Sequence, residues 1–270
     1  MTRDAFILEQ PETSPGRAGR GAIGPLAWFI SRFWGVLLIA AIWQAWVLAN
    51  GFNSIVIARP ASVVLDVLHN PGLYLPNAAQ TLGLAMLGLA LGMAVGTLAA
   101  VLAWGSRIVG GLLAPLALMF SSIPVVAVIP IIARLLGYDL STVLAVVVII
   151  SFFPSFVFTA AGLRALPPGS ADLFRVLGAN RLTTLLRLAL PAALPHWMVA
   201  LRGAAPQAVM AATLGEFLMG TTGLGNIFHT AKDELDMARA LGASLVVATL
   251  AVACFVLASI AEARVRARRR

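Results

Sequence analysis

Charged side chains are scarce in this chain. Only 11% of its 270 residues are charged and 60% are hydrophobic, whereas soluble domains carry about 25% charged residues. A soluble protein of this size keeps a large share of its side chains in contact with water, so it cannot hide this much apolar surface. The composition therefore excludes a soluble globular protein and predicts an integral membrane protein.

Residue types that enzymes and metal sites need are also few. The single cysteine, Cys254, excludes a disulfide framework and a cysteine metal site. The single lysine, Lys232, lies outside any G-x-x-x-x-G-K-[ST] loop, so the chain has no such device for binding ATP. His69, His196 and His229 are too scattered for an H-x-x-x-H or H-E-x-x-H site, and no G-x-S-x-G elbow occurs. We therefore expect no enzyme activity, no metal and no cofactor in this chain.

Long apolar stretches are abundant. A helix needs about 20 apolar residues to cross a bilayer, and six stretches are long enough, one of them interrupted only by Arg202. After trimming for turn residues we place the spans near 30–50, 78–104, 107–136, 140–163, 193–216 and 241–262. The predicted fold class is all-α, a polytopic integral membrane protein with six transmembrane helices.

The positions of the arginines predict the direction of these spans. If the N-terminus is cytoplasmic, the inside segments hold most of the 19 basic residues, and the positive-inside rule then places both termini in the cytoplasm. The first 26 residues are polar, and the apolar run that follows begins too late for a cleavable signal peptide, so we expect an uncleaved anchor. The net charge of +8 comes without the interleaved aromatic residues of single-strand binders, so we expect membrane lipid and no nucleic acid as partner.

Three prolines, Pro115, Pro124 and Pro130, fall within the third span. Each removes a backbone hydrogen bond and bends a helix. In a bilayer such a break survives where protein or a water-filled cavity satisfies the freed carbonyl groups. A broken helix around Ser121, Ser122 and Pro124 therefore indicates a translocation path, with a structural kink as the alternative.

Gly88, Gly92 and Gly96 recur every four residues in the second span. This spacing aligns small residues on one helix face and lets the backbone of another helix approach closely. The pattern predicts helix packing rather than ligand binding.

Two ionisable residues belong to the fifth span. Arg202 is well inside it, and it either lines the translocation path or extends its charge to the cytoplasmic interface. Glu216 is a second candidate for the path, with an interfacial position near the outer mouth as the alternative. The stretch 220–225, which contains Gly223, Leu224 and Gly225, is either a turn or a small periplasmic plug or docking loop.

The longest cytoplasmic loop between spans runs over residues 164–191. Ser170 is placed to cap a first short helix, and Gly178 to end it in a left-handed conformation. A second short helix is expected over 181–190, with leucines on one side and arginines and threonine on the other. Two amphipathic helices that turn at a glycine make a protrusion that another protein can bind.

This loop resembles the cytoplasmic EAA loop of permease subunits of binding-protein-dependent ABC importers. Gly178 takes the glycine position and Asp172 the acidic position six residues earlier, and the loop ends in Leu188-Ala189-Leu190-Pro191. Asp replaces Glu, and Leu and Phe replace the two alanines that follow the acid in the family. The resemblance assigns ATPase coupling to Asp172, Arg175, Gly178, Ala179, Asn180, Arg181, Leu190 and Pro191.

The resemblance continues on both sides of the loop. The further motifs are similar to the sulfonate, taurine and nitrate branch of these permeases, and they are Arg59-Pro60-Ala61-Ser62-Val63, Phe152-Phe153-Pro154, Ala200-Leu201-Arg202, Gly215-Glu216 and Thr222-Gly223-Leu224-Gly225. Membership would imply the type I importer fold, a second permease subunit (a homodimer is expected), and two cytoplasmic ATPases that use ATP and Mg. It would also imply a periplasmic solute-binding protein and a location in the bacterial cytoplasmic membrane.

On this basis the chain divides into four parts. They are a cytoplasmic tail at 1–29, the first span with a periplasmic segment at 30–76, the permease core at 77–262, and a basic cytoplasmic tail at 263–270. The expected cargo is a small polar or anionic solute, such as a sulfonate, taurine, nitrate or a pyrimidine precursor. Two rival functions remain: a secondary transporter or channel that works without an ATPase, and an intramembrane enzyme or assembly factor.

Overall fold

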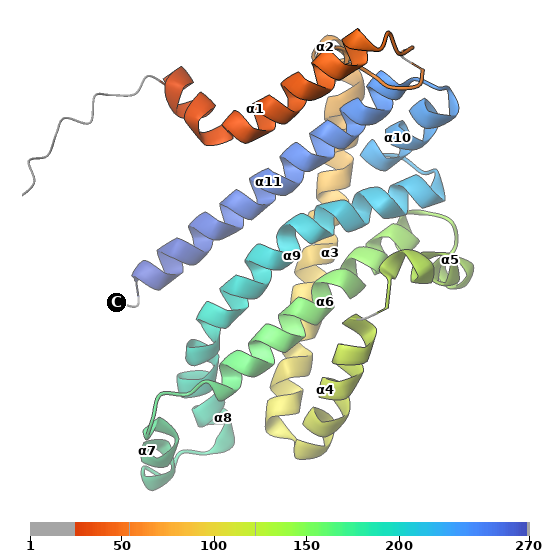
Figure 1. The fold of residues 1–270 in the computed structure, drawn as a ribbon. Coiled ribbons are helices and arrows are strands. Elements are labelled where there is room, and N and C mark those ends of the chain that lie inside the picture. Colours follow the sequence, from red (N-terminus) through yellow and green to blue (C-terminus); the bar gives the residue numbers. More distant parts are fainter. Residues whose placement is uncertain (1–24, 54, 122, 269–270) are drawn as a thin grey trace, which may run out of the picture.

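The computed structural model describes residues 25–53, 55–121 and 123–268, and these residues form helices and connecting turns without a strand (Figure 1). In chain order the elements are α1 (Pro25–Ala49), α2 (Pro60–His69), α3 (Pro71–Gly105), α4 (Arg107–Ser121), α5 (Val125–Leu136), α6 (Leu140–Arg164), α7 (Ser170–Val176), α8 (Arg181–Thr184), the π-turn η1 (Leu185–Ala189), α9 (Leu190–Met219), α10 (Leu224–Asp233) and α11 (Met237–Ala267). The all-α prediction is confirmed.

Four helical segments of the described chain are long and apolar enough to cross a membrane: α3, α6, the continuous run Arg181–Met219, and α11. They correspond to the spans predicted at 78–104, 140–163, 193–216 and 241–262. Each observed helix is longer than its prediction, because polar and proline residues at the ends continue the helix beyond the apolar stretch. The helices α6, α9 and α11 run side by side, and α3 crosses them (Figure 1).

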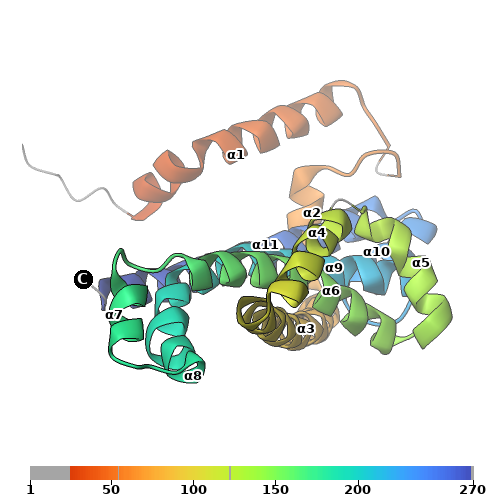
Figure 2. The ribbon, with the colours of Figure 1, turned by 90° about the horizontal axis from the view of Figure 1, so that it is seen from below.

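Neither of the other two predicted spans is among these four segments, and the part of α1 whose side chains the structure describes, Trp34–Ala49, is a shorter apolar helix. In place of a single span over 107–136 the chain forms α4 of 15 residues and α5 of 12 residues, each below the length of about 20 that a crossing needs. The break falls at Pro124, which is extended with φ −60° and ψ 114°, so the predicted break is confirmed. The first span corresponds to α1, which lies apart from the bundle (Figure 2) and meets it where Ala61 N donates to Gln44 Oε1 (3.2 Å).

The glycine stripe on α3 packs against α6, as predicted. A Cβ atom on Gly92 would lie 2.6 Å from both Ser151 Cβ and the carbonyl oxygen of Val148. A Cβ atom on Gly96 would lie 2.6 Å from the carbonyl oxygen of Phe152. Only glycine lets the two backbones approach this closely, which is how helices pack where lipid removes the hydrophobic driving force between them.

Asp139 begins α6 from outside the span. Its carboxyl group accepts hydrogen bonds from the hydroxyl and from the backbone N–H of Ser141. These bonds satisfy a donor of the first turn and hold the pKa of the Asp139 carboxyl below its ordinary value.

The loop between α6 and α9 differs from its prediction in two respects. Ser170 does not cap α7: Gly169, with φ 74°, is the N-cap residue, and the Ser170 hydroxyl donates instead to the carbonyl of Pro167 (2.6 Å). The second short helix is not separate, because α8 and η1 continue into α9 as a helix of 39 residues. Pro191 has no N–H to donate, and the π-turn that precedes it lets the helix continue past this residue.

Candidate functional site

The turn between α7 and α8 is held by backbone hydrogen bonds. Gly178 has φ 70°, a left-handed conformation that glycine adopts without steric strain. Gly178 N donates to the carbonyl of Arg175 (3.0 Å), and Ala179 N donates to the carbonyl of Phe174 (3.0 Å). This pair of bonds is the Schellman motif, which satisfies the free carbonyls at a helix end. The predicted role of Gly178 as the end of the first helix is confirmed.

The polar residues of this turn fix its second half. Asn180 caps α8, since its side-chain oxygen accepts from Thr183 N (2.8 Å). Arg181 Nη1 donates to the carbonyl of Gly105 (3.4 Å) and so ties the turn to the end of α3. Asp172 and Arg175 form an exposed ion pair of 3.0 Å within α7, which contributes little to stability because water screens it.

The surface of this turn is apolar although residues 173–177 lie outside the candidate spans. Val176 is 85% exposed and Leu177 is 72% exposed, with Leu173 and Leu182 exposed beside them. We call these four residues the apolar knob. The knob lies at one end of the molecule, far from α5 and α10 (Figure 1). A group of exposed apolar side chains is typical of a surface that contacts a partner protein or a membrane. Of the predicted coupling residues, Asp172 to Arg181 gather here, whereas Leu190 and Pro191 lie at the start of α9.

Glu216 lies at the opposite end of α9, beneath the loop that leads into α10. Its side chain is fully buried and its Oε2 accepts from Thr81 Oγ1 (2.8 Å) and from Gly225 N (3.0 Å). The Thr81 hydroxyl in turn accepts from Leu224 N (2.9 Å). These bonds connect α3, α9 and the first turn of α10. We call this arrangement of Glu216, Thr81 and the Leu224 and Gly225 amides the outer latch, after the side of the membrane on which the sequence predicts it.

The loop 220–225 fits closely over the latch. Gly223 N donates to Asn77 Oδ1 (2.9 Å), and Gln80 Nε2 donates to the Thr222 hydroxyl. A Cβ atom on Gly223 would overlap the Glu216 carboxyl group, and one on Gly225 would overlap the backbone of α9. The loop is therefore a packed element at this end of α9 rather than a simple turn. Sequence reasoning missed Asn77, Gln80 and Thr81; their signal was three polar side chains at one end of an apolar span.

Arg202 forms an ion pair that the sequence did not indicate. Its Nη1 lies 3.0 Å from Glu262 Oε2, and Arg266 Nη2 lies 2.6 Å from Glu262 Oε1. The Glu262 side chain is 4% exposed and that of Arg202 is 40% exposed. The pair joins α9 to the last turns of α11. The only sequence signal for Glu262 was an acidic residue at the end of the sixth span.

The residues predicted for the translocation path do not gather at one place. Arg202 faces α11, and Glu216 lies about 21 Å further along α9 at 1.5 Å per residue. Pro124 is exposed at the break between α4 and α5. Ser122 lies outside the described residues, and so does the side chain of Ser121. Their role in a path stays a prediction.

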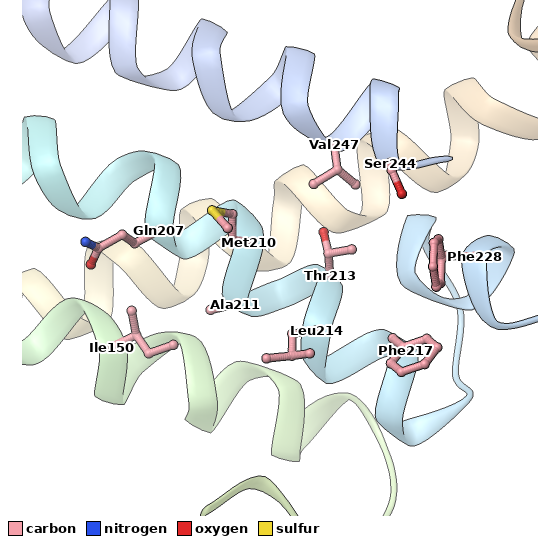
Figure 3. A pocket seen from close by; sticks show the side chains of 10 residues that line it. All are labelled: Ile150, Gln207, Met210, Ala211, Thr213, Leu214, Phe217, Phe228, Ser244 and Val247. Carbon is pink, nitrogen blue, oxygen red and sulfur yellow. The ribbon is translucent and has the colours of Figure 1, made fainter. Parts of the chain in front are cut away.

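A groove that the sequence did not predict lies between α6, α9, α10 and α11. Its volume is about 640 Å³, and its lining is mostly apolar (Figure 3). Three lining residues are polar and uncharged: Gln207, Thr213 and Ser244. Gln207 could have been noticed, because it is an amide in the interior of the fifth predicted span.

Comparison with known proteins identifies the family to which this fold belongs. A family model for the binding-protein-dependent transport system inner membrane component matches residues 76–270. The chain is 30% identical over 201 residues to the formylaminopyrimidine transport permease protein ThiX of Halalkalibacterium halodurans, over 74% of this chain and 80% of that protein. It is 28% identical over 229 residues to the riboflavin transport system permease protein RibX of Chloroflexus aurantiacus, over 84% and 85% of the two chains. It is 26% identical over 203 residues to the putative aliphatic sulfonates transport permease protein SsuC of Bacillus subtilis, over 73% and 74%.

Solved structures share the fold. An amino acid ABC transporter matches 74% of this chain and 97% of its own with a TM-score of 0.63 at 16% identity. The MetNI methionine ABC transporter in an inward-facing conformation matches 71% and 95% with a TM-score of 0.59 at 18% identity. The fold is thus that of ABC importer permeases, and the family model covers most of the chain. The chain belongs to the family of binding-protein-dependent transport system inner membrane components, the integral membrane permeases of ABC transporters.

Proposed function

We propose that this chain is the permease subunit of an ATP-driven importer in the bacterial cytoplasmic membrane, and that its apolar knob docks into a cytoplasmic ATPase. The observation that carries the proposal is the exposure of Val176 and Leu177 on a turn that is itself rigidly held. Apolar side chains outside the membrane gain from burial against a partner. A rigid turn can also transmit force, whereas a flexible loop absorbs it.

The continuous helix from Arg181 to Met219 supports a coupling role. It begins within the docking turn and reaches the outer latch at Glu216. This helix stays continuous although it contains Pro195 and Pro206, so it gives one covalent path along which motion of the ATPase would reach the loop at the other end. ATP and Mg would be held by the partner ATPase, since this chain has no phosphate-binding motif.

The remaining partners follow from the family. We infer a second permease subunit, with a homodimer expected, two ATPases, and a periplasmic solute-binding protein that meets the outer surface around Gly223, Leu224 and Gly225. Both termini and the docking turn then face the cytoplasm. Relatives carry the names of formylaminopyrimidine, riboflavin and aliphatic sulfonate transport, and they support a small polar or anionic solute as cargo.

The proposed docking is tested by placing a charged side chain on the apolar knob. Val176→Glu places a carboxylate on the most exposed apolar position of the turn, and we expect the cognate ATPase to be lost on copurification. Tyr138→Glu is the matched control, because Tyr138 is also exposed (64%) but follows α5 at the other end of the molecule. Equal retention of the ATPase by both variants would overturn the docking proposal, and solute uptake without any ATPase would favour a secondary transporter.

Orientation is tested separately. In a background with Cys254→Ser, Asn180→Cys should react with a membrane-impermeant thiol reagent only from the cytoplasmic side, and Thr222→Cys only from the periplasmic side. Both positions are exposed. Labelling of the two cysteines from the same side would contradict the proposed topology.

A further inference from the structure

Two arginines share one buried carboxyl group between α9 and α11. Arg202 Nη1 lies 3.0 Å from one oxygen of Glu262, and Arg266 Nη2 lies 2.6 Å from the other. The Glu262 side chain is 4% exposed. The group therefore holds two positive charges against at most one negative charge, since guanidinium groups stay protonated in proteins. We call these three residues the arginine cluster.

The cluster has hydrogen-bond donors to spare. A guanidinium group has five N–H donors, and within the described part of the chain Glu262 is the only ionic partner of either arginine. The side chains of Arg202 and Arg266 are 40% and 58% exposed. The Arg202 guanidinium also lies 6.0 Å from the centroid of the Phe255 ring, on the surface of α11. Exposed donors and an excess of positive charge are what an anion needs.

The cluster lies where the apolar surface of α11 ends. Ahead of it, α11 exposes five apolar side chains within a candidate span: Val252, Phe255, Val256, Leu257 and Ile260. After Glu262 the exposed side chains include Arg264, Arg266 and Arg268. This end of α11 is on the same side of the molecule as the apolar knob (Figure 1), which is the cytoplasmic side in the proposed orientation.

We propose that the arginine cluster binds the phosphate of an anionic phospholipid in the cytoplasmic leaflet, with the acyl chains along the exposed apolar face of α11. The inference rests on the proposed orientation and not on ATP-driven import. A phospholipid has a phosphate at one end and hydrocarbon beyond it, and α11 presents arginine and apolar side chains in the same order. The guanidinium fork matches the oxygens of a phosphate, and basic pockets between helices on the cytoplasmic side bind lipid headgroups.

The excess positive charge selects the headgroup. Phosphatidylcholine would bring its choline cation close to the arginines, whereas phosphatidylglycerol carries no cation. Repulsion between like charges is stronger at a partly buried site than in bulk water. Arg264 and Arg268, which are exposed on the last turns of the same helix, add to the positive potential. The site should therefore prefer phosphatidylglycerol to phosphatidylcholine.

A second copy of this chain offers few carboxyl groups to the cluster. Among the acidic residues that the structure describes, Asp172 on α7 and Glu262 are the two on elements at this end; the others belong to α2, to the turn before α6, and to the chain from the end of α9 to the start of α11. Asp172 already pairs with Arg175, and Glu262 is buried. A soluble anion could pair with the arginines, but it would gain nothing from the apolar face of α11.

The test measures lipid binding to the purified, delipidated transporter in a neutral detergent by native mass spectrometry. The probes are phosphatidylglycerol, phosphatidylcholine and glycerol phosphate, which carries a phosphate without acyl chains. We expect phosphatidylglycerol to bind about tenfold more tightly than phosphatidylcholine. Glycerol phosphate should not bind at the same concentrations. Glycerol phosphate that binds as tightly as the lipid would show a site for a soluble anion and overturn the proposal.

Arginine variants locate the binding. Arg202→Gln and Arg266→Gln should each weaken the binding of phosphatidylglycerol about tenfold, because each removes a charged donor to the phosphate. Arg264→Gln is the matched control. It removes the same charge from the same end of α11, but residue 264 is two positions from Glu262 and faces another side of the helix, so binding should stay close to wild type. Equal losses in Arg264→Gln and Arg266→Gln would show general attraction to a basic tail and overturn the site.

The remaining outcomes also decide the proposal. Equal binding of phosphatidylglycerol and phosphatidylcholine overturns it, and so does absence of bound lipid, because another subunit then covers the cluster. Thermal unfolding in the same detergent checks the fold of each variant. If Arg202→Gln does not fold, Arg266→Gln carries the test, since Arg266 is the more exposed partner. Binding in detergent does not depend on orientation, so cysteine labelling that reverses the orientation changes the leaflet and leaves the site.

Discussion

The outer latch predicts that one hydroxyl group controls the opening of the loop at 220–225. Thr81→Val keeps the shape of the side chain but removes the hydroxyl that donates to Glu216 Oε2 (2.8 Å) and accepts from Leu224 N (2.9 Å). Because Thr81 is fully buried, water cannot replace these bonds without opening the loop. The change therefore acts on the loop itself.

The expected change in the free energy of loop opening follows from the two lost hydrogen bonds. Leaving the buried N–H of Leu224 without an acceptor costs about 1 to 3 kcal/mol, and the lost bond to the carboxyl group adds roughly 1 kcal/mol. The sum, about 2 to 4 kcal/mol, raises the equilibrium constant for local opening by a factor of roughly 30 to nearly 1000, at about 1.4 kcal/mol per tenfold. Glu216 retains its bond from Gly225 N, so the loop loosens without the rest of the fold unfolding.

Amide hydrogen exchange in nanodiscs measures this opening. We expect faster exchange across the first turn of α10 in Thr81→Val and unchanged exchange in the middle of α6, which has no part in the latch. Thr81→Ser is the matched control, since it retains the hydroxyl and should exchange close to the wild-type rate. Exchange in Thr81→Val equal to that of wild type would show that the latch does not hold the loop.

Three further predictions concern the packing and the ends of the helices. Gly92→Ala should lower the free energy of unfolding by about 1 to 3 kcal/mol through overpacking against α6, while Gly83→Ala, with nothing within 4 Å of its Cβ, should not; thermal unfolding in detergent compares them. Glu262→Ala should lower the free energy of unfolding by about 1 to 3 kcal/mol, less than the loss of a fully buried ion pair, because both arginine partners are partly exposed. Arg202→Ala should lower it by less than Glu262→Ala does, because Arg266 still pairs with Glu262; equal losses for the two variants in the same assay would contradict this. The pKa of the Asp139 carboxyl is lowered in the folded protein, so its stabilisation of the start of α6 is present above the unfolded-state pKa and disappears as the pH falls through the folded-state pKa. Amide hydrogen exchange at the start of α6 should become faster over this pH range, and Asp139→Asn should remove the pH dependence.

The features that the sequence predicted correctly depend on local physics. Long apolar stretches form helices because a backbone in lipid must satisfy its own hydrogen bonds. The break at Pro124 follows from a missing N–H, and the end of α7 at Gly178 follows from the left-handed conformation that glycine tolerates. The periodicity of a helix is enough to predict that Gly88, Gly92 and Gly96 lie on one helix face.

The features that the sequence did not predict depend on contacts between distant residues. Glu216 contacts Thr81, which is 135 positions away in the chain, and Arg202 on α9 pairs with Glu262 on α11. No local sequence pattern predicts either partner. The groove is likewise a product of four packed helices. The error at Ser170 has a local origin instead, because the carbonyl of Pro167 accepts from the Ser170 hydroxyl and Gly169 takes the N-cap position.

The most direct test of the coupling claim compares two substitutions at Gly178. Apart from its chain neighbours, no described residue has a heavy atom within 4 Å of a Cβ at this position, so a substitution there acts mainly on the backbone conformation of the isolated subunit. Gly178→Val imposes a strain on the order of 1 to 3 kcal/mol on the left-handed turn, whereas Gly178→Asn is tolerated better there.

The measurement is ATP hydrolysis stimulated by the loaded binding protein in the reconstituted transporter, together with the amount of ATPase that copurifies. Both variants should insert into the membrane at wild-type abundance, since the turn lies outside the candidate spans. We predict that Gly178→Val loses stimulated hydrolysis and most of the bound ATPase, and that Gly178→Asn keeps both. Wild-type hydrolysis and full ATPase binding in Gly178→Val would show that this turn does not couple the permease to its ATPase.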